Sequence, residues 1–435
     1  MTRTLDDTAA VERASAKVRQ HLLPFLAVCY LGAYLDRANV GFAALTMNAD
    51  LGIGPEAFGF TAGIFFLGYC LFEVPSNLLL EKYGARRWIA RIMITWGIVS
   101  AMMAFVSGVT GLSIVRFLLG VAEAGFFPGI IFYLTHWVPA AERARIVTMF
   151  MAAIPVSNLI GAPVSGLILD TFNGALGLNG WQWLFILEAL PSIGLGIAAL
   201  WMLPDRPRDA RWLTADESAA LEGHISEEMR ERDGIRKFTL VEALTHPHVL
   251  ALGAVYFGFA TGMYGLTFWL PQIVKAFGLS NTVTGLVTAV PYIAAAIVMI
   301  LWGSHSDVTG ERVWHIAIPA FVGGAALIAG TQVTEIAPAM ALLTIAAAGI
   351  FTTMPLFWTL PTALLTGTAA AGGIALINAI GNIGGFIGPY LVGWLKGHDV
   401  TSAMAVASLA SFALVAGVLV LTLGHDARLE RRAEA

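Results

Sequence analysis

Long apolar runs recur along the chain and are separated by shorter polar stretches. A helix needs about 20 mostly apolar residues to cross a bilayer. The first six runs of this kind lie near 23–44, 57–80, 88–108, 111–135, 146–169 and 183–203, and the next six near 249–274, 284–302, 313–331, 338–359, 371–395 and 402–424. The pattern predicts an all-α polytopic membrane protein with twelve transmembrane helices in two sets of six.

Polar segments divide these runs into blocks. We expect a tail at 1–22, a six-helix bundle at 23–203, a linker at 204–248, a second bundle at 249–424 and a tail at 425–435. The linker is rich in charge, which is typical of a solvated, partly helical tether. The run after the first tail has no small-residue cleavage signature, so we expect an uncleaved first helix rather than a signal peptide.

Composition and charge placement support a membrane protein. Of 435 residues, 57% are hydrophobic and 12% are charged, whereas roughly 25% are charged in a soluble domain. Of the 25 lysines and arginines, 21 lie in the two tails, the linker and alternate loops; Lys275 and Lys396 lie in the other loops, and Arg37 and Arg116 lie within helices. Basic residues concentrate in cytoplasmic loops. We therefore expect an inner (plasma) membrane protein with both termini in the cytoplasm.

Several functional classes are disfavoured. No nucleophile, base and orienting group converge in the sequence, and neither a metal-ligand spacing nor a phosphate-binding glycine loop is evident. We expect no enzyme activity, no cofactor, no metal and no nucleic-acid partner. Cys29 and Cys70 both lie in apolar runs and are expected to be packed free thiols.

A loop motif occurs twice. Asn77, Glu81, Gly84 and Arg86 follow the second run, and Gly303, Asp307, Gly310 and Arg312 follow the eighth, at a constant offset of 226 residues. In each copy a glycine permits a sharp turn at a helix end, and an acid can pair with an arginine or a helix amino terminus.

This loop resembles the signature of the major facilitator superfamily, with Asn77 in place of the first glycine, Glu81 in place of aspartate, and Val308 in place of a basic residue in the second copy. Further stretches resemble the anion:cation symporter family within it. These are Y-L-D-R-A-N at 34–39, E-V-P-S-N at 73–77, R-F-L-L-G-V-A-E-A-G-F-F-P-G at 116–129, F-W-L-P-Q at 268–272, and G-G-I-A-L-I-N-A-I-G-N-I-G-G-F-I-G-P at 372–389.

The resemblance implies two bundles related by a pseudo-two-fold axis along the membrane normal, with the substrate at their interface. It also implies proton-driven uptake of a small organic anion, such as a sugar acid, tartrate, phthalate or hydroxyphenylacetate, by alternating access. We expect a monomer. By the same resemblance, the repeated loops form a cytoplasmic gate.

Charged residues within the predicted helices are the first candidates for function, because ionisable groups inside a membrane are costly and usually functional. Asp36 and Arg37 are adjacent in the first helix and so point about 100° apart. We interpret Arg37 as the anchor of a substrate carboxylate and Asp36 as a protonatable group. A structural ion pair between helices is the alternative.

Arg116 and Glu123 lie two helical turns apart on one face of the fourth helix, which predicts that they interact. By resemblance, Asp36 and Glu123 match the proton-coupling acids of the family, and Arg37 and Arg116 match its substrate and coupling network. Tyr69 matches a substrate hydroxyl contact. Glu73 is as readily a structural partner as a transport residue, and Glu188 is interpreted as structural.

The second bundle offers neutral candidates. Asn378 and Asn382 lie one turn apart on a glycine-rich helix, where substrate contact and interhelical hydrogen bonding are equally compatible with the sequence. Tyr264 and Trp358, followed by Phe268 and Trp269, are candidates for an apolar wall, although aromatic residues more often serve packing. His136, His305 and His315 are interpreted as surface residues at helix ends.

Two observations bear on the substrate and on rival functions. Sugar-acid carriers of the family have a glutamine where this chain has Ile154 and Pro155, which favours a smaller or partly aromatic carboxylate. An efflux carrier or anion exchanger on the same fold, and a non-transporting sensor, are the alternatives. The buried arginines favour an anion over a cationic drug, and a sensor is expected to carry a larger cytoplasmic domain.

Overall fold

The computed structural model describes residues 5–233, 247–364 and 368–423. The expected tail at 425–435 and the second part of the expected linker therefore lie outside the described residues. Within the described ranges every long secondary-structure element is an α-helix. Short 3-10 helices follow some of them, at Met103–Phe105, Ala175–Gly177, Pro207–Asp209 and Gly330–Gln332.

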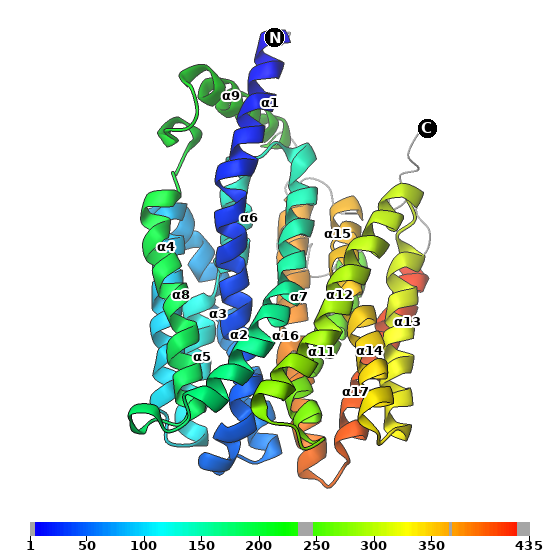
Figure 1. The fold of residues 1–435 in the computed structure, drawn as a ribbon. Helices are drawn as coiled ribbons and strands as arrows, with labels where there is room; N and C mark the ends of the chain where they lie inside the picture. The colour runs from blue at the N-terminus through cyan, green and yellow to red at the C-terminus, as the bar shows by residue number, and fades with distance from the viewer. Residues whose placement is uncertain (1–4, 234–246, 365–367, 424–435) are drawn as a thin grey trace.

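The helices form two groups that stand side by side, with the described chain ends at the same end of the molecule (Figure 1). The first group contains α2 (Leu23–Asp50), α3 (Pro55–Tyr83), α4 (Ala85–Met102), α5 (Val109–Glu123), α6 (Phe126–Thr135), α7 (Ala140–Thr171) and α8 (Gly180–Met202), with α1 (Leu5–His21) before it and α9 (Ala215–Asp233) after it. The second contains α11 (Pro247–Lys275), α12 (Asn281–Thr309), α13 (Val313–Ala329), α14 (Ile336–Phe357), α15 (Thr359–Leu364), α16 (Thr368–Gly397) and α17 (Ser402–Leu423).

Eleven segments of the described chain are long and apolar enough to span a membrane. The twelfth predicted span is α2, whose 28 residues suffice in length. Asp36, Arg37 and Asn39 lie within this helix and lower its mean hydropathy. These polar residues therefore account for the lower hydropathy of α2 compared with the other eleven segments.

The predicted helix at 111–135 is interrupted, contrary to the sequence expectation. α5 ends at Glu123, and Gly125 adopts a left-handed conformation with φ of 83° before α6 begins. A Cβ at Gly125 would lie 2.5 Å from the Ser76 hydroxyl oxygen of α3, so only glycine fits this approach. The break places the Glu123 carboxylate at a helix end.

The expected first tail is itself largely helical and packs against the linker helix α9. The Lys17 ammonium donates to Glu217 at 2.7 Å, and the His21 ring stacks on Trp212 with centroids 4.7 Å apart. Lys17 and the Thr214 amide hold the pKa of Glu217 below its usual value. The Lys17–Glu217 ion pair therefore stabilises the packing of α1 on the linker at pH values above the usual pKa of glutamate. Stronger acid protonates Glu217 and removes this contribution.

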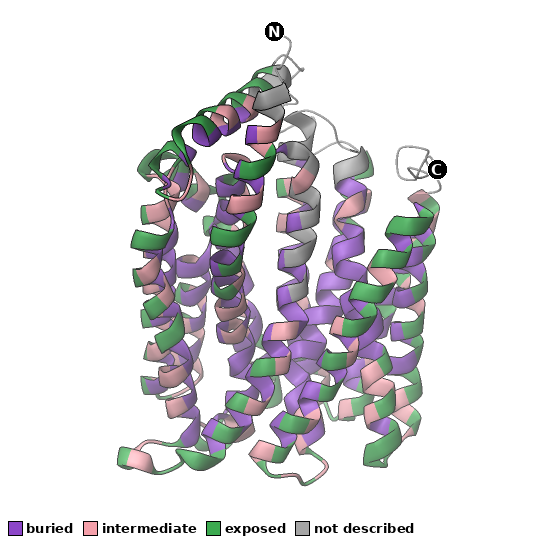
Figure 2. Cartoon of the chain, turned by 45° about the horizontal axis from the view of Figure 1, so that its top comes forward, coloured by how far each residue is buried: buried purple, intermediate pink, exposed green. Residues whose placement is uncertain are grey.

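The two groups meet closely at the end of the molecule opposite the termini. There α7 and α12 cross at glycines: a Cβ on Gly285 would lie 2.3 Å from the Ala162 carbonyl oxygen, and one on Gly166 would lie 2.4 Å from that of Asn281. Small residues permit such close backbone contact between membrane helices. Buried residues accordingly concentrate where the two groups come together, as the view in Figure 2 shows.

Asp170 fastens this crossing. Its carboxylate accepts hydrogen bonds from the Asn281 side chain, the Thr282 amide and the Thr282 hydroxyl, each at 2.7 Å. The acceptor lies at the amino terminus of α12, where the helix dipole favours a negative charge. We call this contact the Asp170 latch.

We expect Asp170→Asn to weaken the latch, because the variant loses the charge and one acceptor oxygen. Hydrogen bonds to charged groups contribute about 1.5–3 kcal/mol each, so α7 and α12 should separate at this crossing about tenfold or more readily. Spin labels on the exposed residues Leu176 and Val283 would report the distance between the two groups.

The matched control is Asp50→Asn, which removes a carboxylate at the same end that bonds Asn179 and Trp181 within the first group. A longer-distance population should grow in Asp170→Asn and not in the control. Identical distance distributions in both variants would contradict the latch.

Candidate functional site

Arg37 occupies the centre of the interface between the two groups. It donates from Nη2 to the Glu123 carboxylate at the end of α5 and from Nη1 to the Tyr264 hydroxyl of α11 at 3.1 Å. The hydroxyl groups of Tyr34 and Tyr264 are 3.3 Å apart. One guanidinium thus connects α2 with a helix of its own group and with a helix of the other.

Aromatic rings surround this guanidinium. Its carbon lies 4.8 Å from the ring centroid of Tyr34, 5.1 Å from that of Phe65 and 5.5 Å from that of Tyr69. Only 11% of the Arg37 side chain and 2% of the Glu123 side chain is exposed. An ion pair held this far from water is costly to separate, because each ion would lose its partner in an apolar surrounding.

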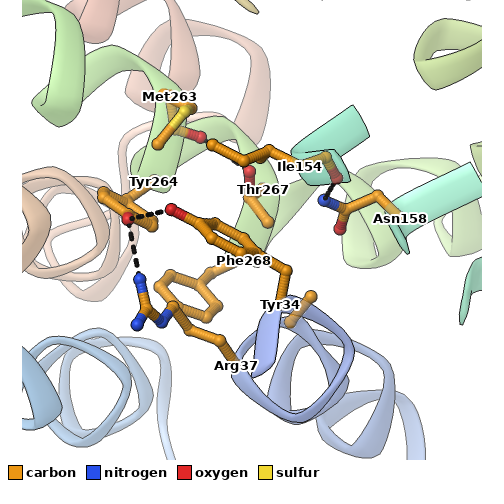
Figure 3. A pocket seen from close by; sticks show the side chains of 9 residues that line it. Tyr34, Arg37, Ile154, Asn158, Met263, Tyr264, Thr267 and Phe268 are labelled. Atoms are coloured by element: carbon orange, nitrogen blue, oxygen red, sulfur yellow. Dashed lines mark hydrogen bonds between the residues drawn. The ribbon is translucent and has the colours of Figure 1, made fainter. Parts of the chain in front are cut away.

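A small cavity adjoins Arg37 (Figure 3). Its lining comes from α2, α7 and α11 and comprises Tyr34, Arg37, Ala38, Ile154, Asn158, Met263, Tyr264, Thr267 and Phe268. Ile154, which together with Pro155 bears on the expected substrate, lies at the cavity. The volume of the cavity is about 10 Å³, roughly what one water needs, so the two groups close tightly around Arg37 here.

Arg116 reaches from α5 to the backbone of α3. Its side chain is fully buried and donates to the backbone carbonyls of Thr61 at 3.4 Å and Ala62 at 2.9 Å, both on α3. Glu123 lies within electrostatic reach of Arg116 on the same helix. The hydrogen bond to the Glu123 carboxylate comes from Arg37 on α2, which the sequence did not indicate.

Asp36 points away from Arg37 into the first group. Its carboxylate accepts from the Trp96 indole at 2.9 Å, the Ser100 hydroxyl at 3.3 Å and the Ser192 hydroxyl at 2.5 Å. The 100° offset between neighbours on a helix accounts for the separation. The three donors come from α4 and α8, and no spacing within the sequence connects them to Asp36.

Glu188 lies buried in the same group and accepts from the Ser165 hydroxyl at 2.6 Å. This contact joins α8 to α7 inside the first group. Asp36 lies within electrostatic reach of the same carboxylate. The structural interpretation of Glu188 stays a prediction.

Glu73 bridges the two groups. The Asn378 amide donates to Glu73 Oε1 at 2.6 Å and the Asn382 amide reaches Oε2 at 3.5 Å. α3 and α16 supply the two sides. The sequence predicted that the asparagines share one helix face and left the role of Glu73 open; the structure brings all three together.

The aromatic candidates divide into two sets. Tyr264 and Phe268 line the cavity beside Arg37. Trp358 instead packs on Tyr256, with ring centroids 5.0 Å apart, and the Trp269 indole donates to the Pro389 carbonyl at 3.0 Å.

The two repeated loops contain the expected turns but use different acids. Gly84 ends α3 with φ of 86° and Gly310 ends α12 with φ of 71°. In the second loop Asp307 pairs with Arg312 at 2.6 Å. In the first loop Glu81 is exposed, and the partner of Arg86 is Asp205, which accepts from the Arg86 amide at 3.1 Å and lies 3.5 Å from its guanidinium. Asp205 follows α8, so the sequence motif did not indicate it.

The interpretation of His305 and His315 as surface residues is wrong for His315, which is buried. Its Nε2 lies 2.7 Å from Nδ1 of His305, and its Nδ1 lies 2.5 Å from Oε2 of Glu311. Trp302 stacks beside both rings. The ends of α12 and α13 converge here, which places residues ten apart in contact.

Comparison with known proteins fits this architecture. A model of the Major Facilitator Superfamily matches residues 26–389. A protein of Agrobacterium vitis, provisionally named a tartrate transporter, is 48% identical over 95% of this chain and 92% of its own length. The inner membrane transport protein RhmT of Escherichia coli is 37% identical over 96% of both chains, and a quinolone resistance transporter of Acinetobacter baumannii is 40% identical over 94% of both.

Among solved structures, a bacterial homologue of the lysosomal transporter Spinster superposes with a TM-score of 0.73, at 17% identity over 96% of this chain and 99% of that one. The xylose transporter XylE of Escherichia coli gives a TM-score of 0.67 at 15% identity, over 93% of this chain and 100% of that one. The fold, the family model and the relatives agree, and the chain belongs to the major facilitator superfamily of membrane transporters.

Proposed function

We propose that this protein is a proton-coupled carrier that takes a small organic anion into the cell by alternating access. The observation that carries the proposal is the Arg37 guanidinium at the interface, which is bound at the same time by Glu123 of its own group and by Tyr264 of the other. A fork of fixed N–H donors suits a carboxylate, and here it lies where two moving bundles would enclose a substrate.

The pair supplies a coupling mechanism. A substrate carboxylate and the Glu123 carboxylate compete for the same guanidinium. Protonation of Glu123 removes its charge and frees Arg37 for the anion, and release of the anion lets Arg37 and Glu123 pair again as the proton leaves. Proton and anion therefore travel together. Asp36, held by three donors within the first group, is proposed as a second proton site.

The cargo in this proposal is a carboxylate such as tartrate, phthalate, hydroxyphenylacetate or a sugar acid. Two arguments support a small one: the tartrate assignment in the name of the Agrobacterium vitis relative, and the apolar Ile154 at the cavity. We propose that the substrate contacts Tyr69, Tyr264, Asn378 and Asn382. Arg116 is proposed to hold α3 in place within the coupling network. Trp358 is proposed to complete the apolar wall by packing on Tyr256.

The proposal includes an orientation. With the basic loops in the cytoplasm, both termini face inward, the bundles at 23–203 and 249–424 act as the two rocking halves of a monomer, and the Asp170 latch closes the outer side. The loops around Arg86–Asp205 and Arg312–Asp307 are then the inner gate.

Uptake into proteoliposomes tests the proposal. Purified protein should accumulate labelled tartrate, or another carboxylate of a panel, when the outside is acidic, and the accumulation should collapse when a protonophore removes the pH gradient. Uptake that follows the concentration gradient alone, unaffected by the protonophore, would contradict proton coupling. A panel that yields no transported carboxylate would contradict the substrate class.

Export is the second candidate, because a relative that is 40% identical is named a quinolone resistance transporter. The same vesicles distinguish it. A carrier that works as an exporter should lower the retention of a preloaded quinolone when protons enter, and it should leave tartrate uptake at the level of empty liposomes.

A further inference from the structure

The contact between Glu73 and the Asn378–Asn382 pair crosses the interface at which the substrate is proposed to bind. Two amide groups on successive turns of α16 direct N–H donors at the two oxygens of one carboxylate. Such a pair is a neutral carboxylate cradle, built on the second bundle. Its occupant in the structure is the side chain of Glu73 from the first bundle, which is 8% exposed.

This cradle lies close to Arg37. The Arg37 guanidinium carbon is 5.5 Å from the ring centroid of Tyr69, and Glu73 follows Tyr69 by one helical turn, which separates their Cβ atoms by about 6 Å. Glu73 is within electrostatic reach of Arg37, so a site for a carboxylate on Arg37 and another on the asparagine pair lie near each other at the interface. The two carboxylates of one small molecule can occupy such a pair of sites together.

An ionised Glu73 holds the two asparagine amides against a second carboxylate. Its negative charge occupies both N–H donors and repels an anion that approaches them. The charged and titratable side chains within electrostatic reach of Glu73 are Arg37 of α2, Tyr69 and Cys70 of α3, and Tyr256 of α11. Of these only Arg37 carries a positive charge, and Glu123 already neutralises it.

We infer that Glu73 is a stand-in for the second carboxylate of a dicarboxylate substrate, and that it must take up a proton and leave the Asn378–Asn382 cradle when that substrate binds. The inference rests on the proposed function and deepens it: the substrate class is a small dicarboxylate, and Glu73 is a specificity-determining and proton-carrying residue beside Glu123. Once protonated, Glu73 no longer repels the anion, and its O–H can donate to it. The asparagine amides then bind the substrate carboxylate in place of Glu73.

Binding measurements on the full-length protein in lipid nanodiscs test this inference. The probes are tartrate, with two carboxylates, and glycerate, which has one and is otherwise hydroxylated in a similar way. Dissociation constants are measured by calorimetry between about pH 6 and about pH 8. In the wild type, tartrate binding should weaken as the pH rises, because Glu73 must be protonated for tartrate to bind.

In Glu73→Gln the occupant has lost its charge, so tartrate should bind about tenfold or more tightly near pH 8 than in the wild type, as expected for a contact involving a charged group. The number of protons taken up with tartrate should fall by about one, as read from the pH slope of the dissociation constant. Glycerate should change little, because it is bound on Arg37 without the cradle. Asp50→Asn removes a carboxylate at the far end of α2 that bonds Asn179 and Trp181 within the first group and should retain the wild-type values.

Asn378→Leu tests the cradle itself, and its result does not depend on whether a Glu73 variant folds. It should weaken tartrate binding about tenfold or more and leave glycerate within about threefold. An unchanged pH slope in Glu73→Gln, or an equal effect of either variant on the two acids, would overturn the inference. A wild type that binds neither acid would instead contradict the proposed substrate class.

Discussion

Replacing Arg37 with glutamine is expected to abolish carboxylate uptake and to weaken carboxylate binding by about 100-fold or more. The variant removes the fork of donors at the interface and leaves the Glu123 carboxylate buried without its partner. Removing one partner of a hydrogen-bonded charge pair at a binding site costs about 2–5 kcal/mol of binding free energy, and each 1.4 kcal/mol is about tenfold in an equilibrium constant. Labelled tartrate uptake and calorimetric binding measure the two effects separately.

Arg91→Gln is the matched control for this prediction. Arg91 also lies within a membrane helix, but its guanidinium carbon packs 3.9 Å from the ring centroid of Trp88 on the same helix. It should retain most of the uptake. The double variant Arg37→Gln, Glu123→Gln should regain stability in thermal unfolding without regaining binding, since the uncompensated charge is gone while the anchor is still missing. Equal uptake in Arg37→Gln and Arg91→Gln would refute the anchor role.

Glu123→Gln is expected to separate exchange from accumulation. The amide keeps the shape of the side chain and leaves Arg37 free for the anion, but it cannot release a proton. Uptake driven by a pH gradient should fall by about 100-fold, as proton transfer groups typically contribute 10²–10⁴-fold, while counterflow between two pools of the anion should stay within about threefold of the wild type.

The two assays use the same proteoliposomes, so protein amount and orientation cancel in their ratio. Asp50→Asn serves as the control, because that acid bonds Asn179 and Trp181 at the far end of α2. Accumulation against a gradient that persists in Glu123→Gln would show that the proton travels on another group, and Asp36→Asn would be the next variant to compare.

The difference between the roles of Asp36 and Arg37 illustrates how sequence and structure divide the explanation. Two adjacent charges within an apolar helix marked α2 as functional, because ionisable groups are costly in a membrane. Their sequence also indicated that they point in different directions. It did not indicate that Asp36 would meet Trp96, Ser100 and Ser192, since those donors lie 60 or more residues away.

The charged network of the first group shows the limit of helix periodicity. The spacing placed Arg116 and Glu123 on one helix face, but it did not indicate that Gly125 ends the helix directly after the acid or that Arg37 bonds Glu123 from another helix. A glycine inside an apolar run is tolerated in many membrane helices, so the run itself does not reveal a break. The approach of Ser76 on α3 at that point decides it.

The sequence by itself determined the number and order of the membrane helices and the repeated turns at Gly84 and Gly310, and it singled out the charged residues within the helices as candidates. It could do so because apolar length, glycine conformation and the cost of buried charge act locally. Only the tertiary structure decided the partners: Glu123 with Arg37, Glu73 with Asn378 and Asn382, Asp205 with Arg86, and His315 with His305. These pairs join different helices, and which helices meet depends on the packing of whole bundles.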